Sequence, residues 1–234
     1  MTISVIIPTY NEADFIPRLI NYLKQHADER LLEIIITDAG SVDDTIRISQ
    51  ELGATAVTAP RKGRAAQMNY GATIAKGEIL YFIHADSFPP PAFMDDIALA
   101  IKDGYSFGRY RTKFDSNNIL LKINAWFTRF DFFMCRGGDQ TLFITQKLFT
   151  ACTGFNEEMK IMEEFEFCTR AKKNGRYKIF NKAALISARK YDQNSWLQVQ
   201  RANAAIVRMF KKGDSQEAML ARYKKMLSYR KNSF

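Results

Sequence analysis

The first 86 residues alternate between apolar runs and amphipathic stretches, and this alternation restricts the fold more than any other feature of the chain. Four runs have the composition of buried strands: Thr2–Pro8, Leu32–Thr37, the weaker Ala54–Thr58 and Glu78–Ser87. The stretches between them have helical spacing. The alternation predicts a mostly parallel sheet with right-handed crossovers and helices on both faces.

Start and stop signals divide this region further. Asn11 is the expected N-cap of the first helix, and Asp43 or Asp44 opens the second. The third helix is predicted over Gly63–Ala75. The turn Pro89–Pro91 prevents regular structure from continuing beyond the fourth strand.

The second half carries weaker signals. The elements predicted there are helices over Pro91–Lys102 and Ile161–Asn174, strands over Tyr105–Phe114, Gln140–Thr145, Tyr177–Phe180 and Leu185–Ala188, and two basic helices from Ser195 onward that meet near Gly213. The aromatic-rich stretch Ile119–Cys135 fits either a packed core or a membrane contact.

Polar residues follow three of the predicted parallel strands: Thr9–Glu12, Asp38–Ser41 and His84–Asp86. Ligands bind at the carboxyl ends of such strands, so we expect these segments to converge on one site. Asp86 offers hard oxygen ligands to a divalent cation, or it braces the turn before the prolines. Asp38 accepts a hydrogen bond from a base or a ribose, or it holds its own turn.

Two further clusters have the composition of functional groups. Arg64 stands at the start of a helix, where an anion is favoured, although the helix fits an ordinary amphipathic one as well. Adjacent Glu163 and Glu164, with Glu166 nearby, suit general-base chemistry, and acidic residues near a helix start are also favoured by the helix dipole.

Charge is distributed unevenly. From Arg170 onward the chain carries 17 Lys or Arg and 3 Asp or Glu, whereas residues 1–169 carry 17 basic and 22 acidic residues. The basic tail predicts contact with an anionic partner, or it is a solvated face. Three cysteines without metal-ligand spacing favour a reducing cytoplasm, and no segment is apolar enough to span a membrane.

In order along the chain, several motifs resemble those of the family 2 glycosyltransferases: Val5–Glu12, Thr37–Thr45, Gly63–Gly71, His84–Asp86 and Glu163–Glu164. A closer likeness is to a bacterial subgroup labelled arsenosugar-biosynthesis-type, on His-Ala-Asp, Gly-Arg-Ala-x-Gln-Met-Asn and Gly-Asp-Gln. The resemblance implies a GT-A, Rossmann-like sheet and inverting transfer of a sugar from a nucleotide diphosphate donor. It implies a GT-A domain over 1–190, with a nucleotide-binding half (1–90) and an acceptor half (91–190), followed by a basic helical extension (191–234).

The same resemblance implies roles for single residues. The nucleotide site would comprise Pro8, Thr9, Tyr10, Asn11, Glu12, Asp38, Gly40, Arg64, Asn69, His84 and Ala85. Asp86 would hold Mg²⁺ or Mn²⁺, and Glu164, next to Glu163, would be the general base. Gly138, Asp139 and Gln140 would edge the acceptor site, and Arg189 or Arg201 would bind the diphosphate.

Departures from the family pattern shape the remaining expectations. His84 replaces the first Asp of Asp-x-Asp, and the Gln-x-x-Arg-Trp motif of processive synthases is missing, so transfer of one sugar is expected. The donor is expected to be a UDP-sugar. The basic tail and the aromatic stretch predict docking at the inner membrane face, where lipid-linked acceptors lie.

Other classes of protein fit less well. A sugar-nucleotidyltransferase would need a glycine-rich loop after the first strand, and Pro8–Glu12 has no glycine. No recognition motif supports binding to nucleic acid. A non-catalytic nucleotide-sugar-binding or membrane-adaptor protein of the same fold remains the alternative, because of His84 and the basic tail.

Overall fold

A computed structural model describes residues 1–132 and 141–228, and it contains one mixed sheet of eight strands in the order β3-β2-β1-β4-β7-β6-β8-β5. The elements of the first half are β1 (Ile3–Thr9), α1 (Ile16–His26), β2 (Leu31–Asp38), α2 (Thr45–Glu51), β3 (Thr55–Thr58), α3 (Arg64–Ile74), β4 (Ile79–Phe82) and β5 (Ser87–Phe88). Strands β1, β2, β3 and β4 pair in parallel, as predicted.

The second half adds antiparallel strands to the same sheet. Its elements are α4 (Phe93–Lys102), β6 (Phe107–Phe114), α5 (Ile119–Phe127), β7 (Leu142–Thr145), α6 (Gln146–Ala151), α7 (Glu163–Ala171), β8 (Tyr177–Ile186), the 3₁₀ turn η2 (Arg189–Tyr191), α8 (Trp196–Lys212) and α9 (Gln216–Met226). Strand β7 pairs antiparallel with β4 and β6, and β6 pairs parallel with β8. One sheet therefore contains strands from both residues 1–90 and residues 91–190. The two short strands expected between 177 and 188 form the single strand β8.

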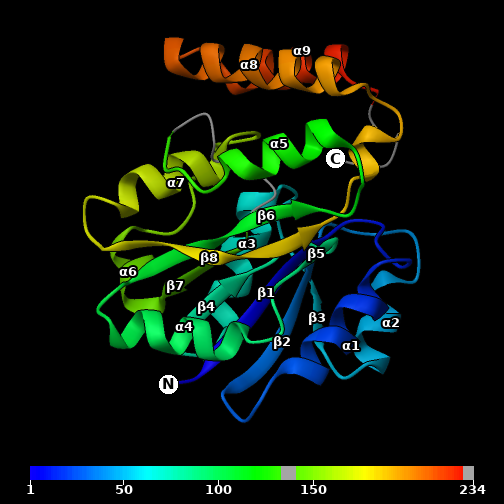
Figure 1. Ribbon diagram of the computed structural model, residues 1–234. Coiled ribbons are helices and arrows are strands. Elements are labelled where there is room, and N and C mark those ends of the chain that lie inside the picture. Colours follow the sequence, from blue (N-terminus) through cyan, green and yellow to red (C-terminus); the bar gives the residue numbers. More distant parts are fainter. Residues whose placement is uncertain (133–140, 229–234) are drawn as a thin grey trace.

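Helices cover both faces of the sheet (Figure 1). Side chains alternate along β1, so that Val5 and Ile7 join α1 and α4 on one face while Ile6 joins α3, α6 and α7 on the other. All three side chains are fully buried, which makes β1 the centre of both apolar layers. This alternation keeps the register of β1 fixed, because a slip by one residue would exchange the faces.

The C-terminal helices form a layer of their own above the sheet (Figure 1). Val199, Ile206 and Met219 of α8 and α9 pack with Met162 and Phe165 at the start of α7 in a third apolar cluster. The two helices predicted near the C-terminus are confirmed, with Gly213 ending α8 in the left-handed conformation. The extension thus rests on the segment that carries Glu163 and Glu164.

The pairing of β5 brings the end of β8 to the site. Strand β5 follows Asp86 directly, and its residues Ser87 and Phe88 pair antiparallel with the end of β8. The Ser187 N–H then donates to the Asp86 carbonyl at 3.1 Å. Arg189, two residues further along, therefore lies beside the carboxyl end of β4.

The predicted N-cap of α1 is wrong. The helix begins at Ile16, with Phe15 at the N-cap position, and Asn11 has φ 53°. The Asn11 N–H donates to Ser41 Oγ at 2.7 Å, and Asn11 Oδ1 accepts from the Val42 N–H at 2.9 Å. Asn11 tolerates the left-handed conformation and joins two loops instead, because its side chain finds its partner on the neighbouring strand–helix unit.

Gln67 of α3 ties the ends of β1 and β2 together. Its Nε2 donates to the carbonyl of Thr9 at 2.8 Å and to that of Thr37 at 2.6 Å, and the residue is 5% exposed. Both carbonyls lie at the carboxyl ends of their strands. The fold thus uses a buried amide to hold the edge on which the candidate site is built.

We expect Gln67→Ala to lower the free energy of unfolding by about 1–3 kcal/mol, because it removes two buried hydrogen bonds, to the carbonyls of Thr9 and Thr37. Urea unfolding measures this change. Gln50→Ala is the matched control, since Gln50 is exposed and donates to one carbonyl, that of Ala56, and its effect should stay within about 0.5 kcal/mol. Equal effects of the two substitutions would contradict the bridging role of Gln67.

Candidate active site

The segments Thr9–Glu12, Asp38–Ser41 and His84–Asp86 lie at the carboxyl ends of β1, β2 and β4 and meet at one edge of the sheet, as predicted. Asn11 contacts the second segment through Ser41. Arg189 joins the first segment to the third by binding Glu12 and Asp86. The remaining predicted nucleotide-site residues of these segments are Pro8, Tyr10, Gly40 and Ala85, of which Ala85 is buried and the others are half-buried.

Asp38 organises the loop after β2. Its carboxylate accepts hydrogen bonds from Thr9 Oγ1 at 3.0 Å, from the Gly40 N–H at 2.8 Å and from the Ser41 N–H at 2.6 Å, and the residue is fully buried. Gly40 has φ 86°, a conformation that glycine adopts without strain. The alternative of a turn-holding Asp38 is therefore what the structure shows, and contact with a base stays a prediction.

Arg189 makes the densest charged contact at this edge. Its Nη1 and Nη2 donate to the two carboxylate oxygens of Glu12 at 2.8 and 2.7 Å, and its Nε lies 2.8 Å from Asp86 Oδ2. The guanidinium stacks 4.5 Å from the ring centroid of Phe15. Burial opposes the charged form, but the hydrogen bonds to Glu12 and the charge of Asp86 outweigh it and raise the pKa of Arg189.

Glu164 faces His84 across the site. His84 Nε2 lies 3.0 Å from Glu164 Oε1, and the residue Glu164 is 8% exposed. Within the described residues, Glu164 Oε2 is buried and has no hydrogen-bond partner. Burial raises the pKa of Glu164, whereas the hydrogen bond with His84 acts in the opposite direction. A carboxylate with one anchored oxygen and one free oxygen is thus held in a dry environment.

Glu163 has a different environment although it is the neighbour of Glu164. Arg64 Nη1, at the first turn of α3, lies 3.2 Å from Glu163 Oε1. The Glu163 side chain is 6% exposed and that of Arg64 is 30% exposed. The pair joins the starts of α3 and α7, so both helix N-termini face the same edge of the sheet.

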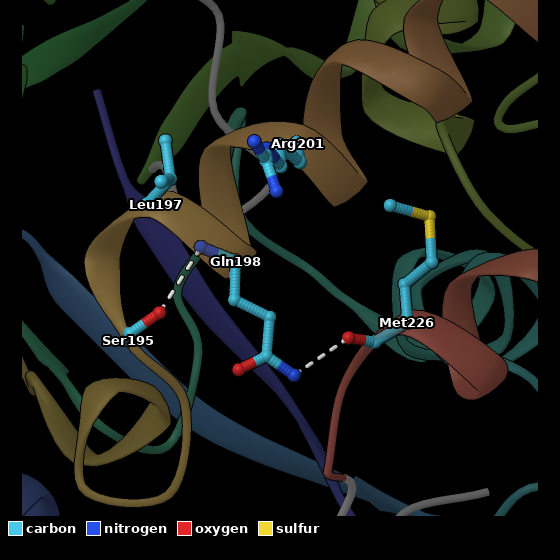
Figure 2. A pocket seen from close by; sticks show the side chains of 5 residues that line it. All are labelled: Ser195, Leu197, Gln198, Arg201 and Met226. Carbon is cyan, nitrogen blue, oxygen red and sulfur yellow. Dashed lines mark hydrogen bonds between the residues drawn. The ribbon is translucent and has the colours of Figure 1, made fainter.

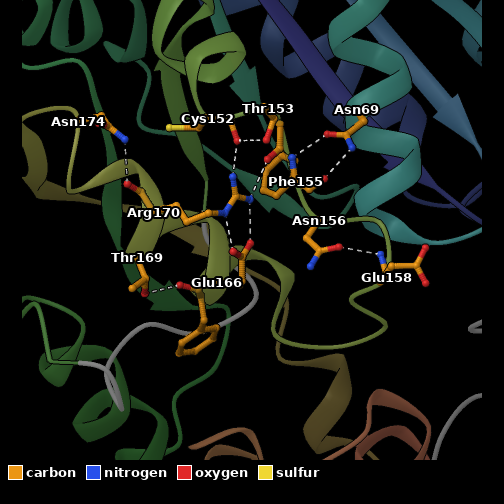
Figure 3. A network of polar contacts seen from close by, with 12 residues as sticks. Asn69, Cys152, Thr153, Phe155, Asn156, Glu158, Glu166, Thr169, Arg170 and Asn174 are labelled. Atoms are coloured by element: carbon orange, nitrogen blue, oxygen red, sulfur yellow. Dashed lines mark hydrogen bonds and ion pairs between the residues drawn. The ribbon is translucent and has the colours of Figure 1, made fainter. Parts of the chain in front are cut away.

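The third member of the acidic cluster, Glu166, has a structural contact. It pairs with Arg170 one helical turn later, and Arg170 Nη2 also donates to the Gly154 carbonyl at 2.8 Å (Figure 3). Asn69 holds the same loop from α3, since its Oδ1 accepts from the Phe155 N–H at 2.8 Å. These bonds fix the loop that precedes Glu163 and Glu164, and a nucleotide contact by Asn69 stays a prediction.

Two sets of predicted residues are not part of the edge described above. Gly138, Asp139 and Gln140 fall outside the described residues. Arg201 is exposed on α8 and lines a hollow of about 270 Å³ between α8 and the end of α9 (Figure 2). The other residues around this hollow are Ser195, Leu197, Gln198 and Met226. Of the two arginines expected at the diphosphate, Arg189 is the one that contacts Asp86.

The residues fit a cation at Asp86, although within the described ranges no three His, Cys, Asp or Glu side chains gather as a metal cluster. Glu12 and Asp86 supply the hard oxygens that Mg²⁺ and Mn²⁺ prefer. The Arg189 guanidinium already stands between them as a positive group. A divalent cation at this point would therefore draw on Asp86 and on oxygens of the donor.

The structure is an α/β domain with charged and polar side chains gathered at one edge of its sheet, and comparison with known proteins gives its family. Residues 4–158, more than half of the chain, match the model of "Glycosyl transferase family 2". The chain belongs to this family.

Curated relatives match over shorter stretches. An uncharacterized glycosyltransferase of Rickettsia bellii is 38% identical over 95 residues, which is 41% of this chain and 31% of that protein. A dolichol-phosphate mannosyltransferase of Pyrococcus furiosus is 30% identical over 109 residues, 44% of this chain and 31% of that protein. Each match thus spans about a third of the relative's length.

Solved structures share the fold over more of the chain. S. aureus TarS 1-349 in complex with UDP-GlcNAc has a TM-score of 0.65 at 22% identity, covering 80% of this chain and 58% of that one. Glucosyl-3-phosphoglycerate synthase from Mycobacterium tuberculosis, in complex with Mn²⁺, UDP and glucosyl-3-phosphoglycerate, has a TM-score of 0.60 at 17% identity, covering 97% and 80%. The expected GT-A-type sheet flanked by helices is confirmed.

The raised pKa of Glu164 predicts how stability depends on pH. The folded protein binds the Glu164 proton more tightly than the unfolded chain does. The resulting contribution to the free energy of unfolding is present below the ordinary glutamate pKa of about 4.3 and is lost as the pH rises through the raised pKa. We therefore expect Glu164→Gln to gain stability over the wild type between pH 5 and pH 8, by about 1 kcal/mol.

Thermal unfolding at several pH values measures the difference. Glu163→Gln is the matched control, because it removes a carboxylate that is paired with Arg64. The Glu163→Gln variant should show no gain in stability over the wild type as the pH rises. A stability difference between Glu164→Gln and wild type that is flat from pH 5 to pH 8 would show that the Glu164 proton is not coupled to folding.

Proposed function

We propose that this chain is an inverting, non-processive glycosyltransferase that moves one sugar from a nucleotide diphosphate donor to an acceptor hydroxyl. One observation carries the proposal: Glu164 presents a buried carboxylate oxygen without a partner in the described residues, beside the arginine-rich edge where the strands end. UDP-sugars are the proposed donors, supported by the UDP and UDP-GlcNAc bound in the solved structures that share the fold.

The proposed reaction is a single displacement. The acceptor hydroxyl attacks the anomeric carbon, the bond to the diphosphate oxygen breaks, and the electron pair leaves with the nucleoside diphosphate. Glu164 takes the acceptor proton as the bond forms. Its raised pKa makes it a stronger base than an exposed glutamate.

His84 has a positioning role in this proposal. Its hydrogen bond to Glu164 Oε1 leaves Oε2 as the oxygen that receives the proton. His84 occupies the place of the first Asp of Asp-x-Asp, so the substitution gives the base a partner instead of adding a carboxylate near the diphosphate. Glu163 stays paired with Arg64, which keeps a second negative charge near the base compensated.

The opposite side of the site would receive the donor. Arg189 and the helix start at Arg64 provide positive charge and N–H groups for the phosphates. When bound at Asp86, a divalent cation would neutralise charge on the departing diphosphate. The likeness to the arsenosugar-biosynthesis-type subgroup, carried by Gly63–Asn69, His84–Asp86 and Gly138–Gln140, remains part of the proposal and does not name the sugar.

Glu164→Gln should lower the transfer rate by about 10²- to 10⁴-fold, because a general base contributes that much. Nucleotide binding, measured as the thermal shift caused by UDP, should stay the same. Glu158→Gln is the matched control, since the Glu158 side chain is 83% exposed in the loop before α7. Wild-type turnover in Glu164→Gln would remove this residue from the role of base.

The alternative is a non-catalytic nucleotide-sugar-binding or adaptor protein of the same fold. The contact between Arg189 and Asp86 is the observation that favours this alternative, because Asp86 already has a positive partner. The two functions differ in an assay without acceptor. A catalytic site releases free sugar from the donor at a slow rate, whereas an adaptor protein releases none.

A membrane surface is the proposed partner of α5. Its exposed apolar side chains are Ile119, Leu120, Ile123, Trp126 and Phe127. The basic helices α8 and α9 lie above it (Figure 1). A bilayer-crossing helix would need greater length and a more apolar composition than any helix has in the described parts of the chain. The proposed contact is therefore interfacial, and it would bring the site to lipid-linked acceptors.

Trp126→Ser/Phe127→Ser should reduce sedimentation with vesicles that contain anionic lipid at low salt, because it removes apolar area from the contact. Basic residues near such a surface add about 1 kcal/mol each, so high salt should also release the protein. Leu99→Ser, at a 59% exposed position on α4, is the control. Failure of the wild type to sediment with these vesicles rules out the membrane contact.

A further inference from the structure

The guanidinium of Arg189 uses all of its donor nitrogens on two carboxylates, Glu12 and Asp86, which follow the adjacent strands β1 and β4. Two nitrogens bind Glu12 at 2.8 and 2.7 Å, in the side-by-side geometry that makes arginine–carboxylate pairs strong. The third, Nε, lies 2.8 Å from Asp86 Oδ2. The contact with Asp86 therefore involves the carboxylate that the sequence assigns to a cation.

This contact is shielded from water. The Arg189 side chain is 21% exposed and the side chains of Glu12 and Asp86 are 17% exposed. Phe15 covers one face of the guanidinium with its ring centroid at 4.5 Å. Partly buried charges interact more strongly than exposed ones, so a second cation at the same carboxylate would be strongly repelled.

The backbone holds Arg189 in this position. Strand β5 pairs with β8, the Ser187 N–H donates to the Asp86 carbonyl at 3.1 Å, and the Arg189 N–H donates to Ser187 Oγ at 3.2 Å. The ion pair thus stands on a hydrogen-bonded strand end and not on a free loop.

We propose that the Arg189 guanidinium is the resident cation of the donor site, and that this guanidinium and a divalent metal ion exclude each other at Asp86. This inference rests on the proposed function, because it describes the cation site of the donor pocket. Glu12 and Asp86 together carry two negative charges, and Arg189 balances one of them. A metal ion binds Asp86 only when the Arg189 guanidinium moves away from this carboxylate. An incoming diphosphate offers new anionic partners to both the metal ion and Arg189.

The proposal predicts weak binding of Mn²⁺ alone and stronger binding of Mn²⁺ with UDP. Arg189→Met keeps an unbranched side chain at this position and removes the charge. We expect it to tighten Mn²⁺ binding about tenfold or more in the absence of nucleotide, measured as the loss of the free Mn²⁺ signal in electron paramagnetic resonance. Adding Asp86→Asn to Arg189→Met should abolish the gain.

Arg47→Met is the matched control. Arg47 also bridges two carboxylates, with 3.0 Å to Asp44 and 2.6 Å to Glu51, but its side chain is 58% exposed on α2. Mn²⁺ binding by this variant should equal that of the wild type. Equal Mn²⁺ affinity in wild type and Arg189→Met would overturn the proposal, as would a gain of the same size in Arg47→Met.

Two further measurements keep the result interpretable. If Arg189→Met does not fold, Arg189→Lys replaces it. Lysine cannot bind Glu12 and Asp86 side by side, so this variant should have an intermediate Mn²⁺ affinity. An Mn²⁺ affinity of Arg189→Lys equal to that of the wild type would overturn the proposal. Thermal shift with UDP tests the donor site separately. Tighter Mn²⁺ binding in the variant without any UDP shift in the wild type would support the cation site and contradict the proposed function.

Discussion

The ion pairs of Arg189 connect parts of the chain that are far apart in sequence. Arg189 and Glu12 are 177 positions apart. Their side chains meet because β5, which follows β4 in the chain, pairs with the end of β8. Without the guanidinium, two partly buried carboxylates would face each other at the edge of the sheet, which is unfavourable at low dielectric. The site therefore depends on a contact between the first strand–helix unit and the last strand of the sheet.

The contact between Glu164 and His84 has the opposite character. Glu164 is buried with one oxygen unpartnered among the described residues, and burial raises its pKa. Such a group lowers the stability of the fold at neutral pH, and sites that carry this cost are commonly functional. The C-terminal helices pack on Met162 and Phe165, on either side of Glu163 and Glu164, so the extension supports the segment that holds the proposed base.

Much of the first 90 residues could be predicted, because parallel strands with alternating side chains place their carboxyl ends at one edge. The convergence of His84–Asp86 with Thr9–Glu12 follows from that rule. The role of Asn11 does not follow from that rule. Its partners Ser41 and Val42 belong to the next strand–helix unit, and local signals favour a helix cap. Loops that bond to one another across units have no local pattern.

Other features of the site need the structure for the same reason. Glu163 and Glu164 are identical neighbours, and only their contacts with Arg64 and His84 distinguish them. Arg189 and Arg201 were equivalent by composition, but the pairing of β5 with β8 places one of them beside Asp86. Gln67 belongs to the Gly-Arg-Ala-x-Gln-Met-Asn motif, but no local pattern indicates that its amide donates to the ends of two strands.

The most direct test of the central claim is proton NMR of the purified protein with α-linked UDP-sugars and Mn²⁺, in the absence of acceptor. Single displacement with Glu164 as base predicts slow release of UDP together with sugar that is first observed as the β anomer, before mutarotation. Release of the α anomer first would contradict inversion. The absence of UDP release from every donor that binds would contradict catalysis itself.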